Sequence, residues 1–336
     1  MYQHIPIEMK LLLTYSDIDP AAWQSLVAQS PYATWFQTPE AYAFYASVPD
    51  EMTPFAVGVD EDGQLMGVVV GYTTWETNPI KQLFTCRSIV IGGPLLDESI
   101  SDNAVTALLC VVKRVTRSSI YVETRNFLDY SRWRHIFEQC GFAYQPHLNI
   151  QVACTATHTM SEQRNRQVKK AMKNGVKIVE PQSEQEICDW YQILRQLYRQ
   201  KVRTPLWSEE FFLQFYRNGV GKYLLVKYEG KVIGGMMCPI FAGKAIYEWY
   251  VCGLDEEYRE QYTSVMATYA AIEYAKQNDI PIFDFMGAGM PDKTYGVRDF
   301  KMEFGGELVE YGRYLYVHKP LLYKMGWWIL TQMKIV

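Results

Sequence analysis

The stretch from residue 281 to residue 312, PIFDFMGAGMPDKTYGVRDFKMEFGGELVEYG, holds the residues best suited to chemistry. An apolar run ends in Asp284, a glycine-rich turn follows, and a helix-like segment then presents Phe300 and Lys301 before a glycine pair. A lysine ammonium in a water-poor site can stabilise an oxyanion, an effect worth roughly 3 kcal/mol for one well-placed donor. The alternative is a solvated helix lysine whose stem covers apolar surface.

Asp284 allows two interpretations. Active sites of α/β proteins commonly lie at the carboxyl ends of strands, so this carboxylate could act as a general base. It could instead accept hydrogen bonds from the backbone N–H groups of the glycine turn, as aspartates at turns often do. The residue types favour the second interpretation.

Positive charge gathers between Met160 and Lys177, where Glu162 is the single acid. The basic residues are Arg164, Arg166, Lys169, Lys170, Lys173 and Lys177. Helical spacing predicts that Arg166, Lys170, Lys173 and Lys177 share one face and that Val168, Ala171 and Met172 form the opposite, buried stripe. The segment is either a solvated face or a contact for the phosphates of RNA or of a nucleotide-linked ligand.

Two further features could bind a substrate. Arg203 lies between a predicted helix and a turn, and its guanidinium fork suits a diphosphate; a helix-terminal ion pair is the alternative. Tyr247 and Tyr250 enclose Glu248 and Trp249 in a strand-like run. Alternation along a strand turns part of this run toward a cleft and part toward the opposite layer, without deciding which.

Composition excludes several classes of protein. The chain has 336 residues, 49% of them hydrophobic, which is ample for one large or two smaller cores. A net charge of −4 gives no overall attraction to nucleic acid. Seven scattered cysteines without C-x-x-C spacing indicate buried thiols in a reducing cytosol. No metal-ligand cluster, P-loop or Ser-His-Asp pattern is visible, so no metal is expected.

The two ends of the chain bear on its location. The first residues show no secretory cleavage pattern, and no run of about 18 apolar residues exists, which favours a cytoplasmic protein. Near the other end, LLYKMGWWILTQMKIV is typical of a packed terminal helix. Peripheral membrane contact is the alternative for that segment.

The order of the predicted elements is similar in the two halves of the chain. Each half has helices, an antiparallel hairpin, a further helix and closing strands. A hairpin turn is expected at Asp62-Gly63 in the first half, since Asp-Gly between two β-branched runs is a strong hairpin signal. In the second half, turns between consecutive strands are expected at Glu229-Gly230 and Ala242-Gly243. Two similar α/β units in tandem are therefore expected, with a seam near residues 153–161.

Strands that precede a helix and a further strand resemble the core of the GNAT acetyltransferases. That core binds the pyrophosphate of acyl-CoA at the N-terminus of its main helix, through a Q/R-x-x-G-x-G/A loop. The corresponding residues 259–264 here are REQYTS. Arg259 is present, but Tyr262 and Ser264 replace the small residues, which argues against acetyl-CoA.

Within that superfamily the chain resembles the FemABX family, tandem-GNAT aminoacyltransferases that add amino acids to peptidoglycan precursors. The similar segments are RNRQVKKAMKNGVKI, YLLVKYEGKVIGGMM with AIYEWYVCG, AAIEYAKQNDIPIFDFMGAG and VRDFKMEFGGELVEYG, and more weakly WFQTPEAYAFY and GGPLLD. The resemblance covers nearly the whole chain and is greatest from residue 161 to 322. The chain looks like the short form, without a coiled-coil arm.

The resemblance implies an α/β (α+β) fold of two tandem GNAT-like domains, each a mixed, mostly antiparallel sheet flanked by helices. Residues 1–155 would bind the acceptor precursor and residues 156–322 would form the catalytic cleft, with 306–336 able to pack back on the first domain. Lys301 would be the positive charge at the reacting centre, with Phe300 positioning and drying the site. The implied substrate-binding residues are Arg203, Tyr250, Tyr247, Arg259 and Lys170.

The function implied is direct transfer of an amino acid from aminoacyl-tRNA to an amine of a nucleotide- or lipid-linked peptidoglycan precursor, without a cofactor. A cytoplasmic location, with peripheral membrane contact as an option, would fit those partners. One alternative is an acyl-CoA-dependent N-acyltransferase acting on a sugar, polysaccharide or lipid intermediate. Another is a non-catalytic binding protein that retains the fold.

Overall fold

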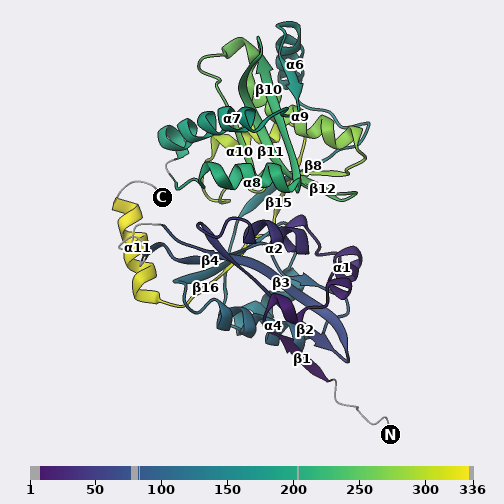
Figure 1. Ribbon diagram of the computed structural model, residues 1–336, viewed down its shortest axis with the longest axis vertical. Helices are drawn as coiled ribbons and strands as arrows, with labels where there is room; N and C mark the ends of the chain where they lie inside the picture. Colours follow the sequence, from purple (N-terminus) through teal and green to yellow (C-terminus); the bar gives the residue numbers. More distant parts are fainter. Residues whose placement is uncertain (1–7, 77–81, 83, 203, 333–336) are drawn as a thin grey trace. The chain divides into compact units, whose positions relative to one another are not determined.

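The computed structural model describes residues 8–76, 82, 84–202 and 204–332. Its contacts divide the chain into two units (Figure 1). Unit 1 comprises Met1–Pro146 and Tyr311–Val336, and unit 2 comprises His147–Glu310. Each unit contains, among the described residues, an eight-stranded sheet. The expectation of two tandem α/β domains with mixed, mostly antiparallel sheets is confirmed.

The sheet of unit 1 has the strand order β1-β2-β3-β4-β6-β16-β7, with β5 paired to β3. Only the β4–β6 pairing among these is parallel. The strands are β1 (Met9–Leu12), β2 (Met52–Glu61), β3 (Gln64–Thr74), β4 (Arg87–Gly92), β5 (Leu95–Leu96), β6 (Tyr121–Asn126), β7 (Ala143–Gln145) and β16 (Arg313–Val317). The helices of this unit are α1 (Pro20–Gln29), α2 (Pro39–Ala46), α4 (Asp102–Val115), α5 (Arg134–Gln139) and α11 (Pro320–Gln332).

The sheet of unit 2 has the order β15-β8-β14-β12-β11-β10-β9, with β13 paired to β11. Here the β12–β14 pairing is the parallel one. The strands are β8 (Leu148–Ala153), β9 (Lys177–Val179), β10 (Gly221–Tyr228), β11 (Lys231–Phe241), β12 (Ala245–Tyr247), β13 (Tyr250–Gly253), β14 (Ile282–Asp284) and β15 (Glu307–Glu310). The helices are α6 (Glu162–Lys173), α7 (Glu184–Leu197), a π-helical turn (Tyr198–Val202), α8 (Glu209–Asn218), α9 (Thr263–Gln277) and α10 (Gly296–Met302).

The domain boundary differs from the sequence expectation. The segment YQPHLNIQVAC was expected to be one closing strand of the first domain, which placed the seam after residue 155. Pro146 interrupts it, because proline has no N–H to donate to a strand ladder. The part before Pro146 is β7 in unit 1, and the part after it is β8, which pairs with β14 and β15 in unit 2.

A reciprocal exchange occurs at the other end of unit 2. β15 pairs with β8, and the chain then enters unit 1, where β16 lies between β6 and β7. Unit 2 therefore ends at Glu310 rather than at residue 322, and the segment from Tyr311 onward belongs to unit 1. The chain thus passes from the edge strand β7 of unit 1 to the inner strand β8 of unit 2, and from the edge strand β15 of unit 2 to the inner strand β16 of unit 1.

The local signals in the sequence form the expected elements. Asp62 and Gly63 have φ values of 51° and 80°, and they connect β2 to β3; Glu229 and Gly230, at 49° and 79°, connect β10 to β11. Positive φ at both central residues matches the right-handed strand twist of a two-residue hairpin. The Thr38 side chain accepts from the Ala41 N–H at the start of α2.

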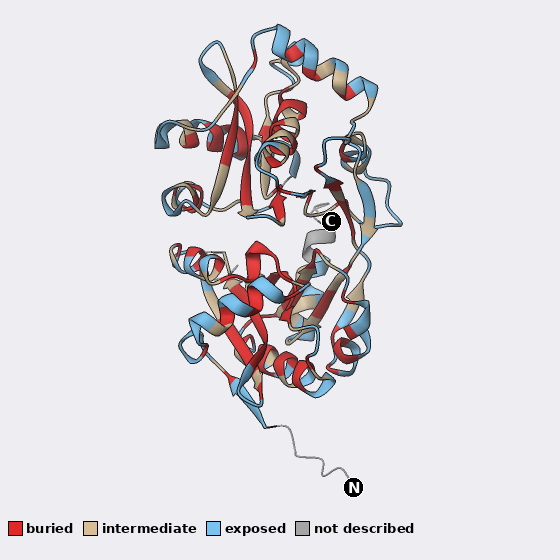
Figure 2. Cartoon of the chain, turned by 90° about the vertical axis from the view of Figure 1, so that its right-hand side faces the viewer, coloured by how far each residue is buried: buried red, intermediate tan, exposed pale blue. Residues whose placement is uncertain are grey.

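Side-chain alternation in unit 2 gives its sheet two packed faces. Leu224 and Val226 of β10 belong to the buried cluster that also contains Met266 and Ala270 of α9. Tyr223, on the opposite face, contacts Trp190 of α7 with a ring-centroid distance of 5.2 Å. Buried residues accordingly run along the strands and along the helix faces turned toward them (Figure 2).

Candidate active site

The strand beside β11 in unit 2 is divided into β12 and β13, which both pair with β11. The parallel pairing of β12 with β14 stops at Tyr247 and Asp284, whereas the strand pairing of β13 runs to β11. Glu248 lies at this division, and its N–H donates to the Asp284 carbonyl at 2.9 Å. Glu248 and Trp249 therefore interrupt the strand, so the simple alternation expected for residues 247–250 does not hold.

The ammonium of Lys301, on α10, lies at the same division. Its Nζ donates to the carbonyl oxygens of Phe285 at 3.0 Å and Gly287 at 2.9 Å, and it lies 2.9 Å from Oε1 of Glu248. The residue is only 9% exposed. Since an ammonium has three N–H donors, these three acceptors occupy all of them. Lys301 is therefore not the solvated surface lysine that the sequence left open.

Glu248 is the counter-ion of this ammonium and is itself buried. Burial raises its pKa above the ordinary value of 4.5, and the nearby Asp284 carboxylate acts in the same direction, while Lys301 opposes both. Loss of hydration disfavours a charge, and two acids around one lysine add repulsion. The site thus contains a buried ion pair with a second carboxylate close behind it.

We expect Glu248→Gln to change how stability depends on pH. The ordinary pKa of 4.5 applies to Glu248 in the unfolded chain, and its pKa in the folded protein is higher. The raised pKa therefore adds to the free energy of unfolding below pH 4.5, and this added stability is lost as pH rises through the folded pKa. The variant lacks this loss. Its free energy of unfolding relative to wild type should rise from pH 4.5 toward neutrality, by about 1.4 kcal/mol per unit of elevation.

Urea unfolding over this pH range measures that difference. Glu257→Gln, which changes an exposed glutamate of the same unit, is the matched control and should show no such trend. If the difference in free energy of unfolding between wild type and Glu248→Gln stays constant with pH, burial does not raise the pKa of Glu248.

Asp284 accepts four hydrogen bonds at its buried carboxylate. The Asn149 amide donates to both oxygens at 2.9 and 3.0 Å, the Gln151 amide donates at 2.8 Å, and the Met286 N–H donates at 2.7 Å. Desolvation nevertheless raises its pKa above 3.8. The bond to Met286 is the turn contact that the sequence favoured over a general base.

The turn after β14 has a conformation that few residues adopt. Gly287 and Gly289 have φ values of 144° and 79°, and Met286, which is not a glycine, has φ of 56°. Positive φ at a residue with a Cβ is uncommon and marks local strain. The turn directs the Phe285 and Gly287 carbonyls at the Lys301 ammonium, so Asp284 supports the lysine through the backbone that it anchors.

Phe300 points away from this ammonium and toward α6. The Arg164 guanidinium carbon lies 4.4 Å from the centroid of the Phe300 ring and 5.6 Å from that of Phe304. Arg164 is buried, and its Nε lies 3.3 Å from Glu303. The stacked guanidinium and the ion pair fasten α10 to α6. Phe300 therefore holds the helix that carries Lys301.

The two candidate tyrosines have different environments. Tyr247 is buried in β12, beside Asp284 in the parallel register. Tyr250 is half-buried, and its ring lies 5.1 Å from that of Phe212 and 6.3 Å from that of Tyr198. Tyr250 thus belongs to the aromatic layer between the sheet and helices α7 and α8. Partial exposure leaves Tyr250 the better placed of the two to meet a substrate.

The N-terminus of α9 is already occupied by a carboxylate of the chain. Asp255 accepts from the Ser264 N–H at 3.0 Å and from the Thr263 hydroxyl at 2.8 Å, and the Ser264 hydroxyl also donates to it. Tyr262, with φ of 48°, precedes the helix in the left-handed conformation. Arg259 lies exposed in a single 3₁₀ turn just before it. This is the helix end at which a GNAT loop would bind pyrophosphate.

The basic segment differs in detail from the predicted helix. The helix α6 ends at Lys173, and Lys177 lies in β9, so Lys177 does not share its face. Met172, expected to be buried, is 46% exposed, whereas Arg164 is buried in its place. Lys170 forms an ion pair with Glu260, and its ammonium lies 5.9 Å from the centroid of the Tyr262 ring.

The predicted phosphate ligand Arg203 lies outside the described residues.

The remaining predictions concern metal sites, cysteines and membrane spans. Within the described ranges, no group of three or more His, Cys, Asp or Glu side chains could hold a metal ion. The seven cysteines, all in described positions, form no disulfide. Four are buried as expected, whereas Cys86 and Cys188 are half-buried and Cys110 is exposed, so the expectation of buried thiols is wrong for these three. No helix in the described part of the chain is both long and apolar enough to span a membrane.

The sequence did not predict the partners of Lys301 and Asp284. Strand alternation alone does not assign Glu248 a partner, although a lone acid between aromatic residues of a buried strand is a signal that it needs a buried cation. Asn149, Gln151 and Asp255 lie far from their partners along the chain or in an unremarkable loop. No local pattern marks them.

Comparison with known proteins supports the fold described above. Residues 160–301 match the family model described as an acetyltransferase (GNAT) domain. The solved structure of FemX is similar, with a TM-score of 0.69, 14% identity, and coverage of 92% of this chain and 98% of FemX. This chain has the tandem GNAT fold. No curated protein matches it significantly in sequence.

Two further solved structures are also similar over most of this chain. A tandem GNAT protein from the clavulanic acid biosynthesis pathway has a TM-score of 0.59 and 13% identity, with 93% of this chain and 99% of that protein covered. L-PGS from Bacillus licheniformis has a TM-score of 0.58 and 13% identity, with 90% and 92% covered. At these identities the comparison establishes the fold, and function must be argued from the site.

Proposed function

We propose that this protein is an aminoacyltransferase that moves an amino acid from aminoacyl-tRNA to an amine of a peptidoglycan precursor. The observation that carries the proposal is the buried Lys301 ammonium at the point where β12 and β14 separate in a GNAT-type sheet. A positive charge fixed in a water-poor site is suited to a reaction that develops an oxyanion. The similarity to FemX adds support for the substrate class.

The reaction requires little beyond positioning and charge. The acceptor amine attacks the ester carbonyl carbon, a C–N bond forms, and the carbonyl oxygen becomes negative. The ester C–O bond then breaks, and the ribose hydroxyl leaves with a proton that the amine has lost. Lys301 stabilises the negative oxygen through its charge, because its N–H donors are held by Glu248, Phe285 and Gly287. Glu248 positions the ammonium.

The occupied N-terminus of α9 supports the proposal that the donor is not acyl-CoA. Helix N-termini bind phosphates through free N–H groups and the positive end of the helix dipole. Here the Asp255 carboxylate accepts from the Ser264 N–H and from two hydroxyls at that end. A pyrophosphate would have to displace this carboxylate or lie beside it. Lys169 and Lys173 on α6 are exposed cations that a tRNA backbone could contact.

The test is intact-mass analysis of muramyl-pentapeptide precursors after incubation with the protein and charged tRNA, with acetyl-CoA in a parallel reaction. The proposal expects an increase of one amino-acid residue that RNase treatment of the tRNA abolishes. An acetyl increment without an amino-acid increment would overturn it. The match of residues 160–301 to an acetyltransferase domain favours that second candidate, an acyl-CoA-dependent N-acyltransferase.

Arg203, Tyr250, Tyr247, Arg259 and Lys170 remain predicted substrate contacts. Of those in described positions, Arg259 and Lys170 are exposed, Tyr250 is half-buried and Tyr247 is buried. Lys170 would have to release Glu260 to bind a phosphate.

A further inference from the structure

The helix α11 of unit 1 has apolar side chains on the side that faces away from the unit. Leu321, Met325 and Trp328 are 78%, 50% and 64% exposed. They are spaced by four and three residues, so they lie on one face of the helix. A helix that merely covered a core would turn this face inward.

The opposite face holds the helix on unit 1. The ring of Tyr323 lies 5.5 Å from that of Tyr121 in β6, in an edge-on arrangement. Gly326, one turn later, lies close to the backbone of Phe84, because a Cβ there would come within 3.7 Å of its carbonyl oxygen. Leu322, Tyr323 and Gly326 are half-buried. The helix is therefore anchored by one face and leaves the apolar one open.

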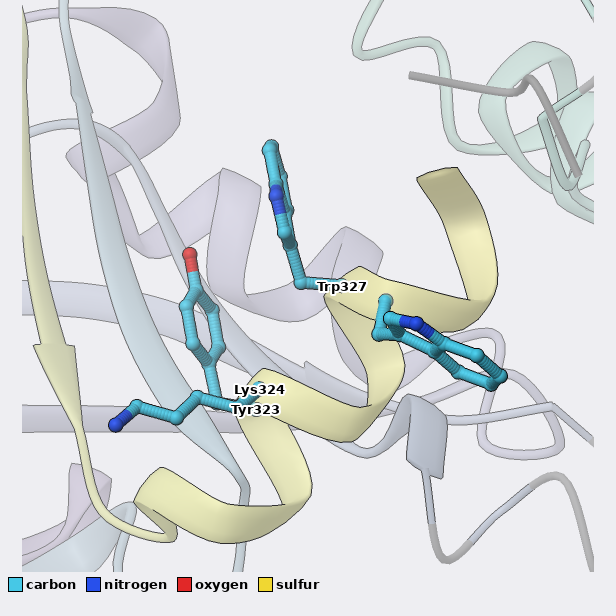
Figure 3. A pocket seen from close by; sticks show the side chains of 4 residues that line it. Tyr323, Lys324 and Trp327 are labelled. Atoms are coloured by element: carbon cyan, nitrogen blue, oxygen red, sulfur yellow. The ribbon is translucent and has the colours of Figure 1, made fainter. Parts of the chain in front are cut away.

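Aromatic and basic side chains border the open face. Trp327 is also about half-exposed, and together with Trp328 it lines a pocket with Tyr323 and Lys324. Figure 3 shows Tyr323 and Trp327 projecting from successive turns of α11, with Lys324 directed elsewhere. Tryptophan and tyrosine are enriched where an apolar phase meets water, since one end of each ring system is polar.

The charge of this part of the chain has one sign. Residues 311–336 contain Arg313, Lys319, Lys324 and Lys334 and no aspartate or glutamate. Burial raises the pKa of Tyr323, and the Glu123 carboxylate acts in the same direction. That carboxylate is ion-paired with Arg125 and Arg313. An apolar helix face bordered by the exposed Lys324 is complementary to an anionic lipid surface, because apolar burial and electrostatic attraction then act together.

We propose that α11 is an interfacial helix that docks the protein on a membrane containing anionic phospholipid. Leu321, Met325 and Trp328 enter the boundary between headgroups and acyl chains, and Lys324 contacts lipid phosphates. The helix lies in the plane of the interface. This inference does not depend on the transferase proposal, because it concerns a surface of unit 1 and needs no turnover.

The test is co-sedimentation of the full chain with vesicles of phosphatidylcholine alone or with added phosphatidylglycerol. We expect binding to the anionic vesicles that weakens with salt, and we expect Leu321→Glu/Trp328→Glu to reduce the partition coefficient by about tenfold or more. Leu11→Glu places the same charge at an exposed leucine of β1 and should leave binding unchanged. Circular dichroism and thermal unfolding confirm that each variant is folded.

Two results would overturn the proposal. One is binding that is absent, or equal for wild type and for the Leu321→Glu/Trp328→Glu variant. The other is a dimer in sedimentation velocity that this variant dissociates while no vesicle binding is seen, since the face would then serve a second copy of the chain. Lys324→Gln should still bind the anionic vesicles, because the apolar face is intact, but its binding should depend less on salt concentration.

Discussion

Lys301→Met is expected to lower kcat for the proposed aminoacyl transfer by roughly 10²–10³-fold, the loss typical when one group that stabilises a developing oxyanion is removed. The substrate contacts remain, so KM should change little. The substitution also strands the buried Glu248 carboxylate. Breaking one partner of a buried ion pair typically costs about 3–5 kcal/mol of stability. A loss of activity in Lys301→Met could therefore come from the missing positive charge or from the lower stability.

The double variant Lys301→Met/Glu248→Gln separates them. Replacing the carboxylate by an uncharged amide removes the stranded charge, so most of the lost free energy of unfolding should return. Activity should stay as low as in Lys301→Met, since the positive charge is still missing. Urea unfolding and single-turnover transfer, measured on the same samples, give both quantities.

Turnover of the double variant within a few-fold of wild type would show that Lys301 has only a structural role, linking α10 to Glu248 and to the turn after β14. Lys276→Met is the matched control, since Lys276 is a half-buried lysine that pairs with Glu273 on α9, within the same unit. It should leave both stability and turnover nearly unchanged.

Asp284→Ala is expected to lower the free energy of unfolding by about 3–5 kcal/mol, because it leaves buried donors without an acceptor. The Asn149 and Gln151 amides and the Met286 N–H all lose their partner. The turn that carries the Phe285 and Gly287 carbonyls should loosen as well, and turnover should then fall with it. Chemical denaturation and transfer assays measure the two effects.

The amide variant Asp284→Asn tests the same argument more narrowly. One oxygen remains for the Met286 N–H, but an NH₂ group now faces the donor amides of β8, so stability should fall by less than in Asp284→Ala. Asp292→Ala, at an exposed position of the same loop, is the control. Equal stability of Asp284→Ala and wild type would mean that water replaces the carboxylate and that the turn does not depend on it.

Local chemistry let the sequence predict much of the fold. Asp62-Gly63 and Glu229-Gly230 formed the expected hairpins because their backbone preferences act within two residues. Thr38 capped its helix for the same reason. The resemblance of the second half to GNAT proteins, and the position of Lys301 within it, could likewise be identified from contiguous residues.

The exchange of β8 and β16 between the sheets could not be predicted in this way. Strand alternation shows that a segment is a strand, but not which sheet pairs with it, because pairing is decided by partners far away in the chain. Pro146 was a visible signal for a break. The strand after it joins β14 and β15, more than a hundred residues further along the sequence.

The sequence by itself determined the elements, the tandem α/β order and the candidate lysine, since each depends on the propensities and spacing of neighbouring residues. Only the tertiary structure decided that Lys301 is buried against Glu248, that Asp284 anchors the turn beneath it, and that Asp255 occupies the start of α9. It also decided that α11 turns Leu321 and Trp328 outward. Burial and long-range pairing are properties of the packed chain, and no local pattern encodes them.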